Sequence, residues 1–367
     1  MKRILALLVA TVLLLAGCGA EKAVQTTAPT EASTAPAETE PKQKSREEMH
    51  IFISLPEEED SRWQRAGADL EMLLRNLFYQ VTLRYAKSDA AEQARQLAEA
   101  LEAGVDCILL APVDPVTLTE VCATAEEMGV PLVSYDRMVT DTEHLDYYVS
   151  YDYRAIGVEM GNHIVEKAAL DTAEKPLTVE FFMGAPEDNR ALLLYLGILE
   201  VLQPYLEEGK LLANSGRTAF EDICTVDGTA GSVEEAFRSY LQDHYRRTRP
   251  DIICTASDAF ADACIRVLEE KKLEIPLITG VGGTEAGLAN VQGKKQSFTV
   301  TLALEPLDEA CVSLIDAVLT GKEPELNDRE SCHNNAAVIP AFLCSHTVHT
   351  PPEEVPEETV PATEPGA

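Results

Sequence analysis

Basic residues are scarce in this chain. Its 367 residues include 30 Lys and Arg against 62 Asp and Glu, which gives a formal net charge of −32 at pH 7. A chain this acidic would be repelled by the phosphates of a nucleic acid, so nucleic-acid binding is excluded as its function. The charge favours a well-solvated surface and carries no information about the fold.

Short catalytic motifs are also missing. The sequence has no nucleophile elbow, no pair of histidines spaced for a catalytic metal and no phosphate-binding loop. The glycine-rich run "GVGGTEAG" contains Gly280, Gly282 and Gly283, but it lacks the GxGxxG spacing and the Lys-Ser/Thr pair. A hinge turn is the better interpretation of this run, because glycine suits backbone turns that other residues avoid. We therefore expect a protein that is not an enzyme and binds no cofactor.

Nine cysteines raise the question of disulfides and metals. Most of them lie in apolar stretches typical of buried strands and helices, where cysteine behaves as a small hydrophobic residue. A Cys332–Cys344 disulfide, or a metal site using "CH" and "CSHTVH", remains an alternative, although neither spacing matches a zinc pattern. We expect no bound metal.

Only one long apolar run is present, from Ile4 to Leu15, and it follows the basic residues Lys2 and Arg3. It is short for a membrane span, and the arrangement is typical of a secretory signal, which we place at residues 1–17. The stretch "LAGC" that ends at Cys18 resembles the bacterial lipobox, whose Cys becomes the lipidated first residue of the mature protein. We predict lipidation of Cys18 and a membrane tether. The alternative is a plain signal peptide with an incidental Cys.

Two segments are poor in apolar residues. Residues 18–48 are rich in Ala, Thr, Pro and Glu, and residues 349–367 are acidic and rich in Pro. Neither can bury enough surface to offset the entropy of ordering, so we predict a disordered tether and a disordered tail. About 300 residues remain between them, enough for two domains.

The central part alternates between strand-like and helix-like stretches. Apolar runs predict strands at 49–56, 79–86, 105–112 and 130–136, separated by amphipathic helices at 61–77, 89–104 and 114–129. The pattern then starts again, with strands at 177–184, 210–216, 251–257 and 276–283 and helices at 189–209, 232–245 and 258–272. Strands that are apolar on both faces predict parallel sheets covered by helices. The predicted fold class is therefore α/β, with two doubly wound lobes.

An acid and a base follow the fourth predicted strand, in "VSYDRM". Ligands of open α/β sheets bind at the carboxyl ends of strands, which is where Asp136 and Arg137 lie. A carboxylate accepts hydrogen bonds from hydroxyls and a guanidinium donates to oxygens, so the pair suits a polyhydroxylated ligand. The alternative is a solvated surface ion pair.

An ordered series of motifs carries a family resemblance. The segments are "SRWQRAG", "VSYDRM", "DYYVSYDYRAIGVEMG", "GAPEDNRA", "VLQPYLEEGKL", "GKEPELND" and "AAVIPAFL", and they span about residues 49–348. The chain resembles the type I periplasmic sugar-binding proteins, the substrate-binding lipoproteins of sugar ABC transporters, and among them the xylose-binding and multiple-monosaccharide branch. The resemblance implies a monomer whose two lobes close over one sugar, and delivery to a membrane permease and ATPase.

The resemblance also implies discontinuous lobes. We expect the first lobe to comprise residues 49–151 and about 282–334, and the second to comprise 152–281 and about 335–348. A lipid anchor would hold the protein outside the cytoplasm. A sensory receptor, or a relative that has lost its ligand, is the alternative function within the same fold.

Site residues follow from the resemblance position by position. The match covers Arg62, Trp63, Asp136 and Arg137 in the first lobe, Asp152 at the hinge, and Asp188, Asn189 and Asp258 in the second lobe. Trp63, the only tryptophan, is expected to pack on the apolar face of a sugar or to be half buried in the lobe. Tyr153 and Arg190 stand where the family carries Asn, and both are included in the expected site.

Three further positions depart from the family pattern. Gly228 replaces an aromatic residue, Gly282 replaces a sugar-gripping carboxylate, and Leu302 stands near an expected Lys. Each hydrogen-bonding group left unsatisfied would cost about 1–3 kcal/mol, so these losses disfavour the usual pentose or hexose. The identity of the ligand is left open between a sugar and a less polar or anionic solute.

Overall fold

Two parallel sheets form the framework of this computed structural model, which describes residues 44–59, 61–225 and 228–352. The first sheet has six strands in the order β11-β5-β4-β3-β1-β2. Its elements begin with η1 (Arg46–Glu48), β1 (His50–Leu55), α1 (Ser61–Asn76), β2 (Gln80–Tyr85) and α2 (Ala90–Glu102). They continue with β3 (Cys107–Leu110), α3 (Thr119–Met128), β4 (Leu132–Tyr135) and β5 (Tyr147–Tyr151), and late in the chain with α10 (Leu304–Leu319) and β11 (Ala341–Cys344).

The second sheet has four strands in the order β7-β6-β8-β9. Its elements begin with α4 (Tyr153–Lys167), β6 (Leu177–Phe182), α5 (Asn189–Glu207), β7 (Leu211–Leu212) and α6 (Phe220–Ile223). They continue with α7 (Ala230–Tyr240), η2 (Leu241–Tyr245), β8 (Ile252–Thr255), α8 (Asp258–Glu270), β9 (Leu277–Thr279) and α9 (Glu285–Gln292). A short antiparallel pair, β10 (Thr299–Thr301) with β12 (Thr347–His349), joins this group through parallel bridges at Thr279–Phe298 and Gly282–Thr301.

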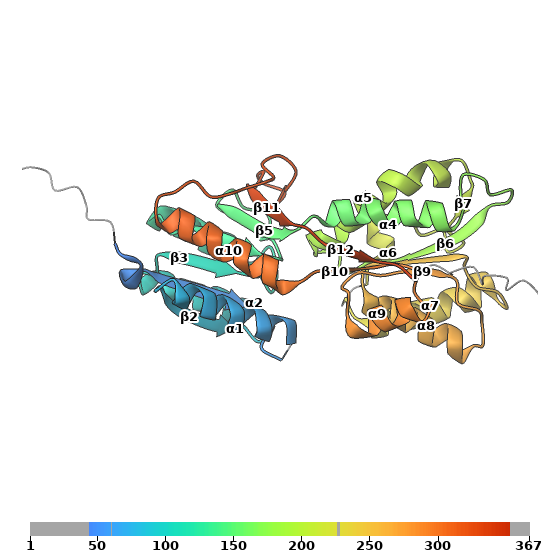
Figure 1. Ribbon diagram of the computed structural model, residues 1–367, viewed down its shortest axis with the longest axis horizontal. Coiled ribbons are helices and arrows are strands. Elements are labelled where there is room, and N and C mark those ends of the chain that lie inside the picture. The colour runs from blue at the N-terminus through green and yellow to red at the C-terminus, as the bar shows by residue number, and fades with distance from the viewer. Residues whose placement is uncertain (1–43, 60, 226–227, 353–367) are drawn as a thin grey trace, which may run out of the picture. The chain divides into compact units, whose positions relative to one another are not determined.

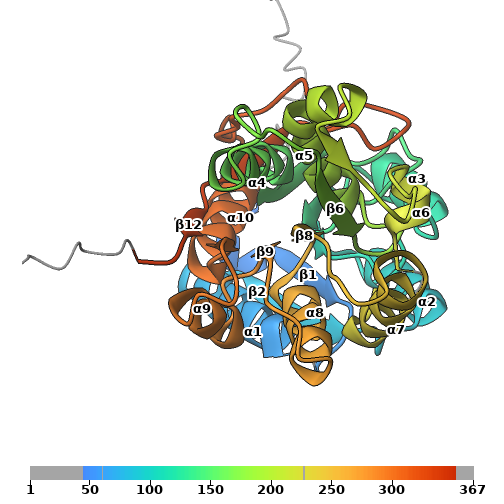
Figure 2. The same cartoon turned by 90° about the vertical axis from the view of Figure 1, so that its right-hand side faces the viewer.

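Both sheets are covered on two faces, as their apolar strands require. In the first lobe, Ile51, Ile53 and Leu55 of β1 pack with α1 and α10, whereas Phe52 packs with α2 and α3 on the opposite face (Figure 1). In the second lobe, α4 and α5 lie on one side of β6 and α7 and α8 on the other (Figure 2). The predicted α/β fold with doubly wound sheets is confirmed.

Helix ends follow the sequence signals. The Asp89 side chain caps α2 by accepting from the amides of Ala91 and Glu92. Gly104 after α2 and Gly129 after α3 have positive φ, the left-handed conformation that glycine adopts without strain. Both glycines mark helix ends, as the sequence predicts.

The lobe boundaries differ from the expectation. Helix α9 packs on α8 and β10 pairs with β12, so residues 285–301 belong to the second lobe rather than the first. Strand β11 pairs in parallel with β5, and the Asn334 side chain donates to the carbonyls of Val139 and Thr142, which places residues 334–344 in the first lobe. The chain therefore crosses between lobes at three places: between β5 and α4, between β10 and α10, and between β11 and β12.

The tether predicted at residues 18–48 and the tail predicted at residues 349–367 each include a few residues that belong to the folded part. Arg46 donates to both carboxylate oxygens of Asp316 at 2.7 and 2.8 Å, and Lys44 pairs with Asp106 at 2.6 Å. At the other end, His349 belongs to β12 and its ring bonds to Thr301. The predictions for residues 1–43, including the signal and Cys18, and for 353–367 lie outside the described residues.

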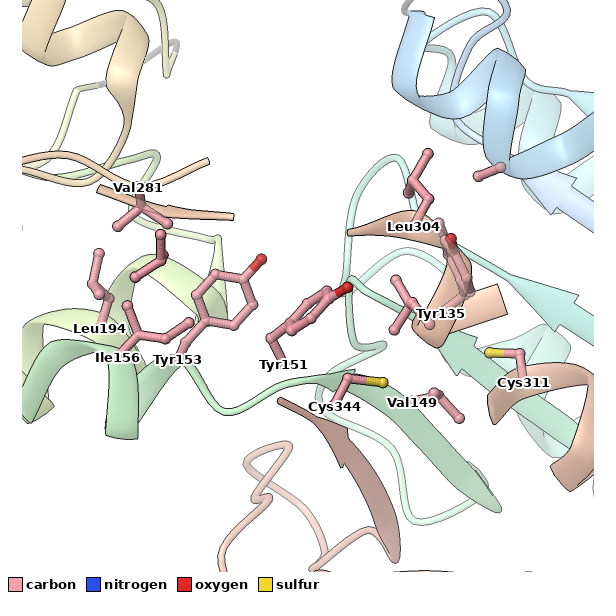
Figure 3. Packing of buried hydrophobic residues seen from close by; sticks show 14 of the residues in the cluster. Tyr135, Val149, Tyr151, Tyr153, Ile156, Leu194, Val281, Leu304, Cys311 and Cys344 are labelled. Atoms are coloured by element: carbon pink, nitrogen blue, oxygen red, sulfur yellow. The ribbon is translucent and has the colours of Figure 1, made fainter. Parts of the chain in front are cut away.

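Apolar packing continues through the crossing between β5 and α4. Tyr151 and Tyr153 lie on either side of residue 152 and belong to one buried cluster with Val149, Ile156 and Cys344 (Figure 3). The Tyr151 hydroxyl donates to the carbonyl of Ala303, on the neighbouring crossing strand. Two of the three crossing segments are thus tied to each other.

All eight cysteines of the described segments are free thiols. The alternative of a Cys332–Cys344 disulfide is therefore wrong; Cys332 contacts the Asp328 carboxylate and Cys344 the Pro306 carbonyl. No group of three His, Cys, Asp or Glu suited to a metal occurs within residues 44–59, 61–225 and 228–352. Within the same residues, none of the helices has the length and apolar character needed to span a bilayer.

Candidate functional site

Asp136 follows β4 directly and is fully buried. Its φ of +59° lies in the left-handed region, which Asp tolerates better than most residues. The Asp136 amide donates to the Val149 carbonyl at 2.8 Å, and its carbonyl accepts from the Tyr148 and Ser150 hydroxyls at 2.9 and 3.1 Å. Neighbouring strand β5 therefore fixes the turn that presents the carboxylate.

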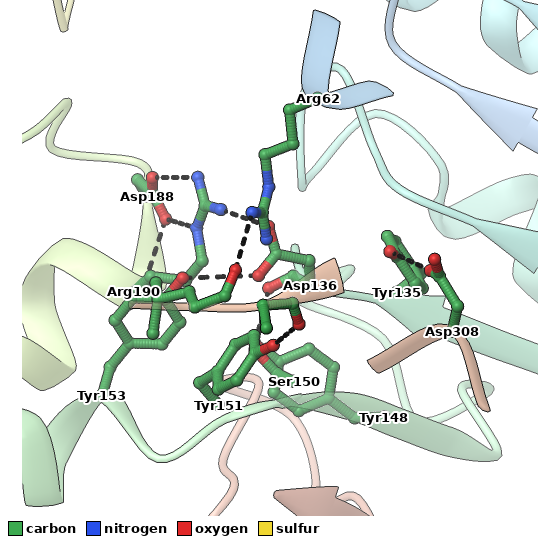
Figure 4. A network of polar contacts seen from close by, with 12 residues as sticks. Arg62, Tyr135, Asp136, Tyr148, Ser150, Tyr151, Tyr153, Asp188, Arg190 and Asp308 are labelled. Atoms are coloured by element: carbon green, nitrogen blue, oxygen red, sulfur yellow. Dashed lines mark hydrogen bonds and ion pairs between the residues drawn. The ribbon is translucent and has the colours of Figure 1, made fainter. Parts of the chain in front are cut away.

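Three donors from different elements meet this carboxylate (Figure 4). Arg190 Nη1 lies 2.7 Å and Arg62 Nη2 3.4 Å from Oδ2, while the Tyr153 hydroxyl lies 3.3 Å from Oδ1. Burial alone would raise the pKa of Asp136, but Arg190 and Arg62 outweigh it and hold this pKa below its ordinary value. The surface ion pair considered for Asp136 is excluded by its burial.

Arg190 reaches Asp136 from the N-terminus of α5. Asp188 caps that helix by accepting from the Arg190 amide at 3.0 Å. The same carboxylate holds the Arg190 guanidinium as a fork, with Nε 2.9 Å from Oδ1 and Nη2 2.8 Å from Oδ2. Burial opposes the charge on Arg190, yet Asp188 and Asp136 raise its pKa well above the ordinary value. One guanidinium thus joins an acid of each lobe.

Residues of both lobes line a cavity of about 490 Å³ around this network. Its size falls within the range of about 300–1,000 Å³ typical of small-molecule sites. Its polar lining residues include Arg62, Arg137, Tyr153, Asp188, Arg190 and Ser257. Its apolar lining residues include Leu194, Ala256, Phe260, Val281 and Leu302. Apart from Leu302, these apolar residues were not singled out from the sequence, although Ala256 and Val281 lie near the ends of the strands predicted at 251–257 and 276–283.

Arg137 lines this cavity and an adjoining one of about 370 Å³. Its guanidinium lies 5.2 Å from the ring centroid of Trp63, a cation–π contact, and its Nη1 lies 3.5 Å from the Pro112 carbonyl. Trp63 itself is only 3% exposed and packs edge-on against Tyr135. Trp63 therefore does not line the cavity; its ring lies beneath Arg137 and supports it.

Like Trp63, the expected site residues Asp152 and Asp258 do not line the cavity. Asp152 caps α4 through the Ala155 amide and lines separate grooves with Ser331 and Leu343. Asp258 is buried and accepts from Thr284, Gln296 and Thr299, at 2.6–3.0 Å. Its carboxylate holds the loop after β9 against β10, so it is engaged within the second lobe.

The remaining positions singled out from the sequence line the main cavity or the adjoining one. Asn189 lines the adjoining cavity, and its side-chain nitrogen is buried without an acceptor among the described residues. Gly228, Gly282 and Leu302 all line the main cavity and contribute no polar side-chain group there. The departures noted in the sequence therefore coincide with the cavity wall.

Comparison with known proteins supports the assignment of the family. Residues 51–323 match the family described as periplasmic binding protein domain. The multiple sugar-binding periplasmic protein SbpA of Azospirillum brasilense is 28% identical over 298 residues, covering 80% of this chain and 83% of that protein. The D-xylose-binding periplasmic protein of Escherichia coli is 24% identical, over 81% of this chain and 85% of its own length.

A solved structure is similar at the level of the whole fold. An ABC transporter solute-binding protein from Clostridium phytofermentans, crystallised with β-D-glucose, superposes with a TM-score of 0.77 at 29% identity, covering 82% of this chain and 94% of that one. The expected family is thereby confirmed: this chain belongs to the periplasmic binding proteins and has the type I fold of their sugar-binding members.

Proposed function

We propose that this protein captures one monosaccharide or sugar-like solute in the cavity between its lobes and carries out no chemistry on it. One observation supports this most directly: charged side chains from β4 and from the start of α5 converge on a cavity that both lobes line. The cavity lies at the carboxyl ends of parallel strands, where open α/β sheets bind ligands. The relatives described above are named for sugar binding.

The polar and the apolar residues that line the cavity have different roles in the proposed mechanism. Arg62 and Arg137 of the first lobe donate hydrogen bonds to ligand oxygens, and Arg190 and Asp188 complete the polar surface from the second lobe. The apolar lining residues pack on the C–H side of the ligand; they include Leu194, Phe260 and Val281. Contacts to both lobes stabilise the closed form, because a ligand shifts an equilibrium only by binding one state more tightly.

The finer parts of the proposal concern the cellular setting. A signal at residues 1–17 and a lipid on Cys18 would hold the protein outside the cytoplasm on the membrane, where it would pass the ligand to an ABC permease and its ATPase. The alternative is that the protein is a sensory receptor of the same fold, whose partner is a sensor protein rather than a permease. We expect a monomer without a cofactor.

Replacement of Arg137 tests the site. Arg137→Ala removes charge-assisted donors, each worth about 1.5–3 kcal/mol, so affinity for the bound sugar should fall by about 10- to 100-fold. A thermal-shift screen of pentoses, hexoses and sugar acids identifies the ligand, and isothermal titration calorimetry then compares the variant with the parent protein. Arg95→Ala, on the exposed face of α2, is the matched control.

Two outcomes would contradict the proposal at different levels. Unchanged affinity in Arg137→Ala would remove Arg137 from the site while leaving the function intact. Absence of any thermal shift across the panel would contradict the binding function itself.

A further inference from the structure

The second lobe contributes mainly glycines and apolar side chains to the cavity. These residues lie where its parallel strands end and the following helices begin, after β6, β8 and β9 and near the start of α5, α7 and α8. They include Gly228, Gly282, Leu194, Ala256, Phe260 and Val281. Most of the residues that this lobe places at the cavity therefore offer a ligand no side-chain hydrogen bond.

The polar side chains that the second lobe places at the cavity are bound within the protein. Tyr153 donates to Asp136 at 3.3 Å, and Arg190 donates to the same carboxylate at 2.7 Å. The Asp188 carboxylate holds Arg190 at 2.8 and 2.9 Å. Ser257 caps α8 by accepting from one of its backbone amides at 3.2 Å. Three of these four side chains are thus gathered around Asp136 (Figure 4).

Backbone groups at the same strand ends are paired as well. The Ala256 amide donates to the Phe182 carbonyl at 2.9 Å. The Gly282 amide donates to the Val300 carbonyl at the same distance. A ligand hydroxyl packed here would lose its bonds to water and would have to compete with bonds of the fold for a new partner. An unpaired buried hydroxyl weakens binding, whereas a C–H or methyl group in the same place gains from being buried.

We propose that the ligand is a deoxy sugar, a monosaccharide in which at least one hydroxyl is replaced by hydrogen, and that its deoxygenated carbon packs against Ala256, Phe260 and Val281. This inference rests on the proposed function and specifies its substrate class. The remaining hydroxyls of the sugar meet the polar residues around Asp136. Apolar sites discriminate against an added hydroxyl by about 10- to 100-fold, so the fully hydroxylated parent sugar binds more weakly.

Calorimetry on the purified protein tests the ligand class with matched sugars. The pairs are D-glucose with 2-deoxy-D-glucose and with 6-deoxy-D-glucose, D-galactose with D-fucose, and L-mannose with L-rhamnose. Among these sugars and the thermal-shift panel, we expect the tightest ligand to be a deoxy sugar that binds at least about tenfold more tightly than its own parent.

The other outcomes separate the ligand class from the binding function. Tightest binding by a fully hydroxylated sugar or a sugar acid, or an advantage of the deoxy sugar below about tenfold, would overturn the deoxy assignment and leave the binding function standing. Absence of binding by every sugar in the pairs, together with no thermal shift across the panel, would overturn the binding function as well.

The apolar lining is tested with a matched pair of variants. Val281→Thr adds a hydroxyl at the cavity with little change in volume, so the preference for the deoxy sugar over its parent should fall by about tenfold. Val338→Thr, at a position of the first lobe that is 39% exposed, should leave the preference unchanged. If Val281→Thr does not fold, as judged by circular dichroism, Ala256→Ser serves in its place, at a half-buried lining position. An unaltered preference in the folded variant would overturn the proposal.

Discussion

Two buried carboxyl groups of the first lobe, Asp136 and Asp308, have opposite pKa shifts. Asp136 meets arginines, which lower its pKa, whereas Asp308 of α10 accepts a hydrogen bond from the Tyr135 hydroxyl. The other Asp308 oxygen is buried and has no partner among the described residues. Burial raises the pKa of Asp308 to about 7. Asp308 therefore holds its proton over a range in which an exposed carboxyl is ionised.

This difference predicts a dependence of stability on pH. Between about pH 4 and pH 7 the folded protein keeps the Asp308 proton and the unfolded chain releases it, so the contribution of Asp308 to the free energy of unfolding should fall as pH rises. His163, whose pKa is lowered to about 4 by burial, contributes the opposite slope over much of this range. The slope from one group is at most about 1.4 kcal/mol per pH unit. In chemical denaturation, the free energy of unfolding should therefore rise with pH more steeply in Asp308→Asn than in the parent protein, whereas Glu309→Gln, an exposed neighbour on α10, should follow the parent. Equal slopes in Asp308→Asn and the parent protein would contradict the raised pKa of Asp308.

Single positions were predictable where the sequence places a polar residue directly after a strand. Asp136 and Arg137 follow β4, and both the burial of Asp136 and the exposure of Arg137 to the cavity agree with that position. The contacts of Trp63 and Asp258 could not be predicted, because their partners lie elsewhere in the chain: Arg137 for the ring, and Thr284, Gln296 and Thr299 for the carboxylate. Pairing over such separations leaves no local signal.

Helices α4 and α5 make the closest interhelical contact of the second lobe through two glycines. A Cβ atom added to Gly157 would lie 2.1 Å from the Leu194 carbonyl oxygen, and one added to Gly197 would lie 2.1 Å from the Arg154 carbonyl oxygen. Real side chains do not approach backbone so closely, so either substitution requires the helices to separate. The N-terminus of α5 carries Asp188 and Arg190, and its position depends on this contact.

Gly197→Ala should therefore lower the free energy of unfolding by about 1–3 kcal/mol, the usual range for overpacking. Gly231→Ala in α7 is the control, because the added methyl group would meet only Thr229 Oγ1 at 3.8 Å and alanine favours a helix. Urea denaturation monitored by circular dichroism measures both. Equal stability of Gly197→Ala and the parent protein would indicate that the helices adjust without cost.

The order of strands and helices was predictable because each has its own hydrophobic period and end signals. The lobe to which the last elements belong was not, since β11 pairs with β5 across roughly 190 positions of sequence and only that pairing assigns it to the first sheet. Amphipathic patterns indicate that a segment is a strand or helix. They do not indicate which sheet edge it joins.

The free thiols are a property of the whole molecule. Seven of the eight described cysteines are buried, and Cys224 is partly exposed, with burial raising its pKa to about 11. Thiolates are the reactive form, so the native protein should react slowly with a thiol reagent, and mainly at Cys224. In protein that begins after Cys18, denaturation should expose all eight.

Spectrophotometric titration with Ellman's reagent at mildly alkaline pH checks this expectation. Cys224→Ser should abolish most of the slow native signal and reduce the denatured count from eight to seven. Fast reaction of several thiols in the native protein would contradict the burial of these side chains.

The three crossings between lobes also make each lobe depend on the end of the described chain. The sheet of the first lobe lacks its edge strand β11 until residue 344 is available. The second lobe lacks β12, the partner of β10, until residue 349 is available. Neither lobe can therefore be completed from its own N-terminal part, and a chain cut shortly before residue 341 should leave an unpaired sheet edge in both lobes.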